Sequence, residues 1–195
     1  MIPSGLSLGS FEITPDIILK FVRCKTGTSP PSPGPDGIPQ SFLEQFISQL
    51  LLPLTELFKY LRHLGHMPSQ WKTANITPVF KKGLSSKVSN YTSISLTSIF
   101  CKLFKRLIQG KILTYLSDNN LISPHQHGFL TKHSTCCQLL EAVNDCSIAL
   151  RNKHVVDDVY FDFAKAFDTV SRVKLISKLQ TSSLWHRWNF AVDYH

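Results

Sequence analysis

The stretch from Tyr160 to Val170 contains the residues best suited to chemistry. Strand alternation places Phe161 and Phe163 on the face opposite Asp162, so we expect this carboxylate at the tip of an apolar strand. Burying a carboxylate without compensation is costly, and either a protein cation or a bound metal ion can compensate it. Mg²⁺ binds carboxylate oxygens together with substrate phosphates, which suits a strand-end aspartate. The alternative is that Asp162 accepts hydrogen bonds from turn amides or pairs with Lys165.

Histidines and cysteines form a second group of potential metal ligands. They are His125, His127, His133, Cys136 and Cys137. Zinc sites usually show C-x-x-C or H-x-x-x-H spacing, which this group lacks, and two adjacent cysteines suit one tetrahedral ion poorly. We therefore expect structural or incidental roles for these side chains. The sequence also contains no glycine-rich phosphate-binding loop and no nucleophile elbow.

Helical periodicity predicts most of the elements that must position these side chains. Thr14-Pro15-Asp16 is typical of a helix start, with a hydroxyl cap, an early proline and an acid at the positive dipole end. A helix beginning near Ser171 should turn Val173, Ile176 and Leu179 inward. The other predicted helices cover residues 42–50 and 54–64, the latter stopped by Gly65, a long run from Ile99 to near Asn119-Asn120, and a run from about Ser134 to the break at Asn152.

Two strands are predicted. Residues 74–80 form the first, which ends in the basic turn Lys81-Lys82-Gly83, and residues 155–163 form the second, with Asp162 near its far end. Residues 27–39 contain so many prolines and glycines that no regular element fits, and composition alone favours a flexible linker there. Together the elements predict a helix-rich α+β fold with few strands.

The composition indicates an intracellular protein with a polyanionic partner. The 195 residues include 21 Lys and Arg against 13 Asp and Glu, a formal charge of +8, which suits nucleic acid or an acidic membrane surface. Only 17% of the residues are charged, so we expect a partner to cover part of the surface. The five cysteines are expected to be reduced thiols. The sequence shows no signal peptide or membrane-spanning run, which predicts a protein of the cytoplasm and nucleus.

The segment around Asp162 resembles the first palm motif of non-LTR (LINE-type) retrotransposon reverse transcriptases. That motif is an aspartate, two variable residues and then Lys-Ala-Phe-Asp, which matches Asp162 to Asp168. Ordered blocks upstream extend the resemblance over about residues 11–179. They are Ser32 to Pro39, Trp71 to Ala74, Pro78 to Gly83, Asn90-Tyr91, Ile94 to Leu96, Cys101-Lys102, Gln126 to Phe129, Ser134-Thr135 and Gln138 to Leu140. So many blocks in the family's order argue against a linker at residues 27–39.

The resemblance implies a right-hand polymerase fold, with fingers and a truncated palm, rich in helices and with a small incomplete antiparallel sheet. Residues 1–62 would be an N-terminal helical segment leading into the fingers. Residues 63–179 would be the reverse transcriptase domain, and residues 180–195 a divergent tail. The implied partners are an RNA template, a DNA primer, deoxynucleotides and the missing remainder of the palm and thumb, rather than a membrane.

The resemblance also implies roles for particular residues. Asp162 would be the catalytic residue and the Mg²⁺ ligand. Lys81 or Lys82 would reach the nucleotide phosphates, Phe167 would lie under the sugar of the incoming nucleotide, and Phe163 would also belong to the nucleotide site.

Four departures from the family pattern bear on activity. Thr92 and Ser93 stand where the family has Arg-Pro, so a bidentate clamp on the triphosphate is lost. His133 stands where the family often has an arginine. The second catalytic motif, aromatic-x-Asp-Asp, is absent, because the only acid after the first motif is Asp193. Residues 180–195 no longer resemble the family.

These departures predict a fragment of an RNA-directed DNA polymerase that is inactive alone. In the intact family nucleotidyl transfer depends on Mg²⁺, but one carboxylate cannot balance two metal ions, so we expect weak or absent Mg²⁺ binding here. The alternatives are a non-catalytic nucleic-acid-binding remnant and a pseudogene-derived fragment.

Overall fold

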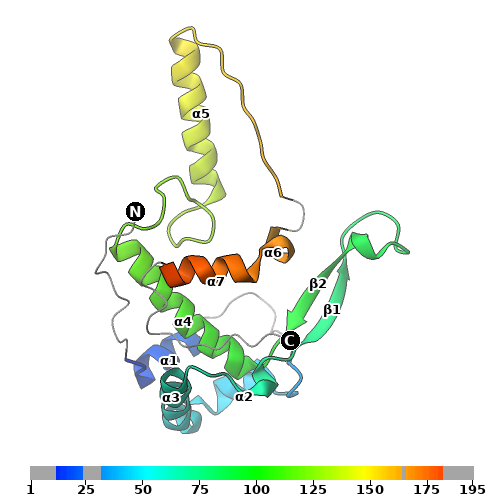
Figure 1. Cartoon of the computed structure of the whole chain (residues 1–195), viewed down its shortest axis with the longest axis vertical. Coiled ribbons are helices and arrows are strands. Elements are labelled where there is room, and N and C mark those ends of the chain that lie inside the picture. The colour runs from blue at the N-terminus through cyan, green and yellow to red at the C-terminus, as the bar shows by residue number, and fades with distance from the viewer. Residues whose placement is uncertain (1–11, 24–31, 164–165, 182–195) are drawn as a thin grey trace.

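The computed structural model describes residues 12–23, 32–163 and 166–181, whose elements are arranged as in Figure 1. The α-helices are α1 (Pro15–Arg23), α2 (Gln40–Gln45), α3 (Ile47–Leu64), α4 (Ile99–Asp118), α5 (Thr135–Arg151), α6 (Ala166–Thr169) and α7 (Arg172–Thr181). Strands β1 (Asn75–Phe80) and β2 (Tyr91–Leu96) form an antiparallel hairpin, and 3₁₀ turns cover Ser69–Trp71 and Val88–Asn90. The prediction of a helix-rich chain with a small antiparallel sheet is confirmed. None of the helices in these ranges combines the length and the apolar character that crossing a membrane requires.

Helices α1 to α4 form the base of the molecule, and its core lies where α1, α3 and α4 meet (Figure 1). Phe58 of α3 and Phe104 of α4 are fully buried, with ring centroids 5.1 Å apart. The Trp71 ring lies 6.2 Å from each of them. Ile18 of α1 is also fully buried. Each side chain of this size contributes about 1.5–3 kcal/mol by leaving water, so the base has a packed core.

The two apolar runs predicted between residues 42 and 64 form a short α2 and a longer α3. The break between them lies at Phe46, whose φ of −106° and ψ of 15° end α2. Pro53 lies inside α3, where a proline removes one backbone hydrogen bond. As predicted, α3 ends at Gly65, whose φ of +64° is left-handed and whose N–H donates to the Leu61 carbonyl (3.0 Å).

Residues 32–39 pack against the start of α4 and do not form a linker. A Cβ on Gly34 would lie 2.5 Å from the carbonyl carbon of Thr97 and 2.6 Å from the nitrogen of Ser98, so only glycine fits there. Gly37 has a φ of +67°, and its N–H donates to the Gly34 carbonyl (3.0 Å) to close a turn. The expectation from composition is therefore wrong for this part, and the first residues of the expected linker lie outside the described ones.

Residues 135–163, which comprise α5 and the chain that follows it, form an arm that stands away from the base (Figure 1). The helix predicted to begin at about Ser134 is α5, and the Ser134 hydroxyl caps it by accepting a hydrogen bond from the Cys137 N–H (3.2 Å). Residues 155–163 are extended but do not form the predicted strand. Among the described residues β1 and β2 pair only with each other, so this segment has no strand to pair with.

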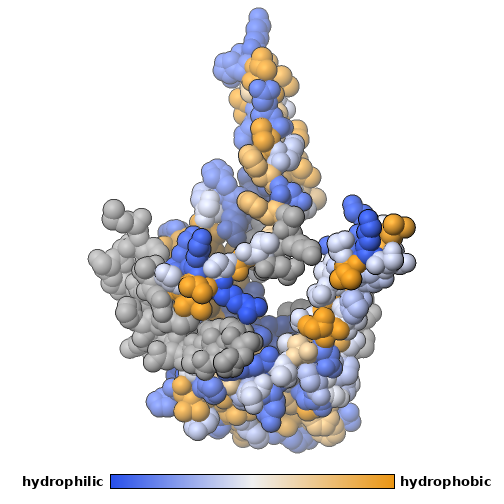
Figure 2. Space-filling model, turned by 45° about the vertical axis from the view of Figure 1, so that its right-hand side comes forward, coloured by the Kyte–Doolittle hydropathy of each residue, from blue (hydrophilic) through white to orange (hydrophobic). Residues whose placement is uncertain are grey.

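The outside of the arm is rich in apolar side chains, as Figure 2 shows. Leu140 is 70% exposed and Leu150 is 65% exposed. In α7 the prediction of an inward Val173 is wrong, since that side chain is 78% exposed, while Ile176 is half-buried and the Leu179 side chain lies outside the described ones. Helical periodicity thus located these helices, but an apolar face is buried only where another element covers it.

Candidate nucleotide and metal site

The β1–β2 hairpin positions Lys81 and Lys82 at its turn. Phe80 pairs with Tyr91 at the end of the antiparallel register, and their rings meet edge to face with centroids 5.4 Å apart. The Lys81 N–H donates to the Asn90 carbonyl (2.9 Å), which extends the pairing into the turn. The two lysines therefore leave the ribbon at a fixed point, and both are exposed.

The turn itself is held by the side chains of Asn90 and Tyr91. Asn90 Nδ2 donates to the Leu84 carbonyl (2.9 Å), and the Tyr91 hydroxyl donates to the Ser85 carbonyl (2.9 Å). Gly83 has a φ of +93°, and a Cβ there would lie 2.6 Å from Asn90 Nδ2. The glycine after the two lysines and the Asn-Tyr pair are thus parts of one structure, although they are seven residues apart.

The positive charge of the chain is concentrated around this hairpin. Residues 57–117 contain ten Lys and Arg and no Asp or Glu, whereas the rest of the chain contains 11 basic and 13 acidic residues. Among the described residues no carboxylate lies within ion-pair distance of Lys81, Lys82 or Lys87. An exposed basic turn without acids attracts phosphate groups.

Thr92 and Ser93, which replace the arginine and proline expected at these positions, lie within β2. Thr92 pairs with Val79 and Ser93 pairs with Pro78, and both are exposed. Because neither side chain carries a charge, the lysines of the turn are the cations that this part of the hairpin offers.

Asp162 lies in the extended part of the arm with its side chain exposed. Its neighbours Phe161 and Phe163 are 85% and 78% exposed, so the apolar strand expected to carry the carboxylate is not formed. Phe167 belongs to α6, but its side chain lies outside the described ones, as does Lys165. Figure 1 shows the turn of the hairpin well apart from the segment that contains Asp162, so the described chain does not bring the lysines and this carboxylate together.

The described residues hold no group of three or more His, Cys, Asp or Glu side chains placed to bind one metal ion. Asp158, four residues before Asp162, accepts a weak hydrogen bond from the Cys146 thiol (3.8 Å). Among the described residues, no second metal ligand therefore accompanies Asp162. A single exposed carboxylate does not fit a site for two Mg²⁺ ions.

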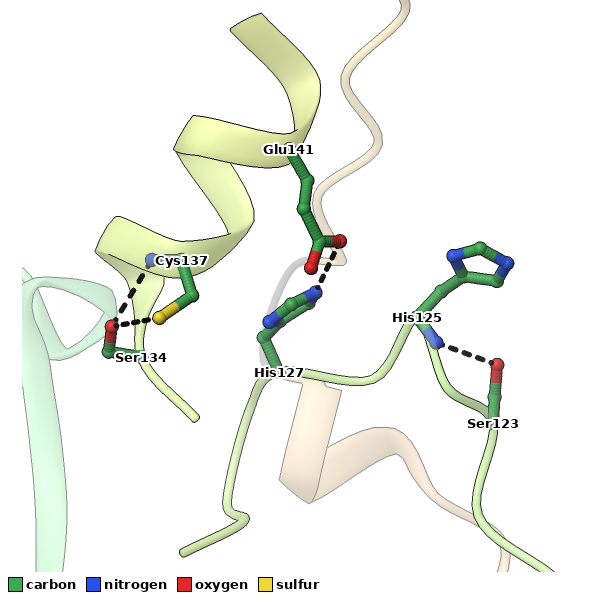
Figure 3. A network of polar contacts seen from close by, with 6 residues as sticks. All are labelled: Ser123, His125, His127, Ser134, Cys137 and Glu141. Carbon is green, nitrogen blue, oxygen red and sulfur yellow. Dashed lines mark hydrogen bonds and ion pairs between the residues drawn. The ribbon is translucent and has the colours of Figure 1, made fainter. Parts of the chain in front are cut away.

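His127 joins the loop before α5 to that helix, as Figure 3 shows. It is buried, and its Nε2 lies 3.0 Å from Oε2 of Glu141 on α5. The His133 ring lies 5.4 Å from the His127 ring. The His125 side chain points away from His127 (Figure 3). Sequence reasoning missed the His127–Glu141 contact, because no motif or periodicity connects residues 14 positions apart.

Cys101 belongs to the base and not to a reactive site. Burial raises the pKa of its thiol, although the nearby Lys105 and Lys102 act in the opposite direction. Its Sγ donates to the Trp71 carbonyl (3.4 Å). A buried thiol with a raised pKa is a poor nucleophile and is best understood as a packing group.

About three quarters of the chain is similar to polymerases of mobile elements. The chain is 30% identical over 150 residues to the probable RNA-directed DNA polymerase from transposon X-element of Drosophila melanogaster. The matched region covers 76% of this chain and 16% of that protein. It is 30% identical over 148 residues to the RNA-directed DNA polymerase from mobile element jockey of the same species, covering 75% and 16%. It is 27% identical over 154 residues to the retrovirus-related Pol polyprotein from type-1 retrotransposable element R2 of Popillia japonica, covering 79% and 20%.

The chain is thus distantly homologous, over most of its length, to non-LTR retrotransposon reverse transcriptases. At this level the resemblance seen in the motifs is confirmed. The chain spans about a sixth of the length of the X-element and jockey proteins. No known family profile matches it.

Proposed function

We propose that this chain is part of a retrotransposon RNA-directed DNA polymerase, contributing the fingers and the start of the palm, and that alone it does not polymerise DNA. The observation that carries the proposal is the 30% identity over 150 residues to polymerases of mobile elements. The exposed Lys81 and Lys82 at the hydrogen-bonded turn support it, because a polymerase must hold the phosphates of a nucleotide or template.

In this proposal Lys81 and Lys82 bind phosphates, Phe163 and Phe167 contribute to the nucleotide site, and Asp162 is the catalytic metal ligand. Mg²⁺ would supply charge stabilisation for nucleotidyl transfer in an intact polymerase. Because the described residues offer Asp162 without a second or third ligand, they do not fit a two-ion site. The chain alone should therefore bind Mg²⁺ weakly or not at all, and its own residues provide phosphate binding and not chemistry.

One observation favours a second function, a non-catalytic protein that binds RNA or DNA. The acid-free stretch of residues 57–117 carries the whole positive excess of the chain and does not depend on Asp162. Lysines along such a stretch would neutralise backbone phosphates and release counterions, which makes binding strongly dependent on salt.

Primer extension tests catalysis directly. The chain is given an RNA template, a DNA primer, deoxynucleotides and Mg²⁺, beside an Asp162→Ala variant. We expect no extension by either protein. Extension by the wild-type chain that Asp162→Ala abolishes would show that the chain is active alone, and equal extension by both would remove Asp162 from the mechanism.

Salt-dependent binding tests the role of the hairpin. We expect a chain carrying both Lys81→Gln and Lys82→Gln to bind single-stranded RNA more weakly. The slope of the logarithm of its binding constant against the logarithm of the salt concentration should be smaller in magnitude by about 1.4, since each phosphate contact to a single strand contributes about 0.7. Lys153→Gln, in the turn at the end of α5, is the matched control and should leave the slope unchanged. Equal slopes in all three proteins would show that the hairpin lysines do not bind phosphates.

A further inference from the structure

The base contains a cavity that neither the hairpin nor Asp162 uses. Residues of α1, α2 and α4 surround about 220 Å³. Its apolar wall consists of the buried side chains of Val22, Leu43, Ile99 and Leu103 and the half-buried ring of Phe21. A dry cavity of about 150 Å³ holds one benzene molecule, so this space accepts a single ring or a short acyl chain together with a small polar group.

The charged side chains among the described residues at this cavity are both cationic. Lys102 and Arg106 are one turn apart on α4 and therefore share a face of that helix, and Gln40 of α2 lies at the same cavity. Lys102 and Arg106 are both half-buried, so their aliphatic stems line the space. None of the described residues that line the cavity is an acid.

An apolar space bordered by cations selects a particular class of ligand. The apolar wall favours a ring or chain, because that part of the ligand leaves water. The Lys102 ammonium group favours a phosphate or carboxylate through charge-assisted hydrogen bonds, and the Gln40 amide adds a further hydrogen-bonding group. A ligand with only one of these two parts leaves the other half of the site unused.

We propose that this cavity is a binding site for a small amphipathic anion, with its ring or short chain between α1, α2 and α4 and its anionic group held by Lys102. The cavity is separate from the proposed polymerase site and the proposal does not depend on it. The small volume matches a free small molecule, since a peptide or nucleic-acid segment needs a longer groove.

Three probes on the unmodified chain test the proposal by isothermal titration calorimetry. They are phenyl phosphate, which has both parts, inorganic phosphate, which has only the anion, and benzyl alcohol, which has only the ring. We expect phenyl phosphate to bind with one-to-one stoichiometry and at least tenfold more tightly than either half. Three results would each overturn the proposal. If inorganic phosphate bound as tightly as phenyl phosphate, the site would be only a surface cation, and if benzyl alcohol did so, it would be only an apolar cavity. If phenyl phosphate showed no saturable binding, there would be no site.

A charge-removing variant locates the site. Lys102→Met keeps the apolar stem, and we expect it to weaken phenyl phosphate binding about tenfold, the loss typical of one charge-assisted hydrogen bond, without changing the binding of benzyl alcohol. Lys105→Met, an exposed lysine on the same helix that does not line the cavity, is the matched control. The Lys81→Gln and Lys82→Gln chain should bind phenyl phosphate normally, which separates this cavity from the hairpin.

Unchanged affinity in Lys102→Met, or an equal loss in Lys105→Met, would overturn the assignment of the anionic group to Lys102. If Lys102→Met fails to fold, as judged by its circular dichroism melt, the three probes on the unmodified chain still decide whether the site recognises both parts of the ligand.

Discussion

The base and the arm are built from the same kinds of residue and differ in what covers them. In the base, Phe58 and Phe104 are fully buried, and Trp71 meets the ring of Phe58 edge-on and that of Phe104 at a tilt. In the arm, Phe161 and Phe163 are 85% and 78% exposed. Both regions have the apolar periodicity expected of buried elements, but in the base three helices meet, while the arm stands apart from them (Figure 1).

This difference shows that an apolar pattern predicts an element but not its burial. Exposed apolar residues gathered in one region usually mark a surface that another element or partner covers. The low charged fraction of the chain also predicted that a partner covers part of the surface. Many of the exposed apolar side chains that such a partner would cover lie in the arm. Stability should therefore depend on the base, and changes in the arm should have little effect on the folding of the chain alone.

The largest contrast is expected between two phenylalanines. Phe104→Ala should lower the free energy of unfolding by about 3–5 kcal/mol, because it leaves a cavity in the packed core. Phe161→Ala should change it by no more than about 0.5 kcal/mol, since that ring is already in water. Urea unfolding followed by circular dichroism measures both. Similar losses in the two variants would mean that the arm is covered in solution.

Two glycines give the next contrast. Gly34→Ala should destabilise the chain by about 1–3 kcal/mol, because the new methyl group would meet the backbone of Thr97 and Ser98, which cannot move as a flexible side chain can. Gly128→Ala, in the loop before the arm, is the matched control, because a Cβ there meets nothing within 4 Å. The same urea titration applies, and a neutral Gly34→Ala would show that residues 32–39 do not pack on α4 in solution.

The cysteines give the smallest effect, a difference in rate without a change in stability. In a short pulse of iodoacetamide at pH 8, the exposed Cys136 and Cys137 should be alkylated before the buried Cys101. Burial raises the pKa of Cys101, so a smaller fraction of this thiol is ionised at a given pH, and its access to the reagent is also blocked. Mass spectrometry of the peptides gives the order. Early labelling of Cys101 would indicate that the base opens readily.

Some features of the candidate site depend on residues that are neighbours in the sequence, and others depend on residues that are distant in it. The basic turn at Lys81 and Lys82 could be expected from the sequence, because a strand followed by two lysines and a glycine is a local pattern. How Asn90 and Tyr91 support that turn, and how His127 meets Glu141, could not be expected, since these contacts join residues whose spacing follows no period. The roles proposed for Asp162, Phe163 and Phe167 rest on the resemblance alone, and their tests are biochemical.

By itself the sequence determined where most of the helices lie and where the first strand ends in its basic turn, but it did not predict β2 or the break between α2 and α3 at Phe46. Ser134 caps α5 and Gly65 ends α3 through contacts with backbone only three or four residues away, so their neighbours in sequence suffice. Only the tertiary structure decided that Gly34 must be a glycine and that residues 155–163 do not become a strand. Close packing and strand pairing both depend on groups that are distant in sequence, and a strand has no stability of its own until such a partner is present.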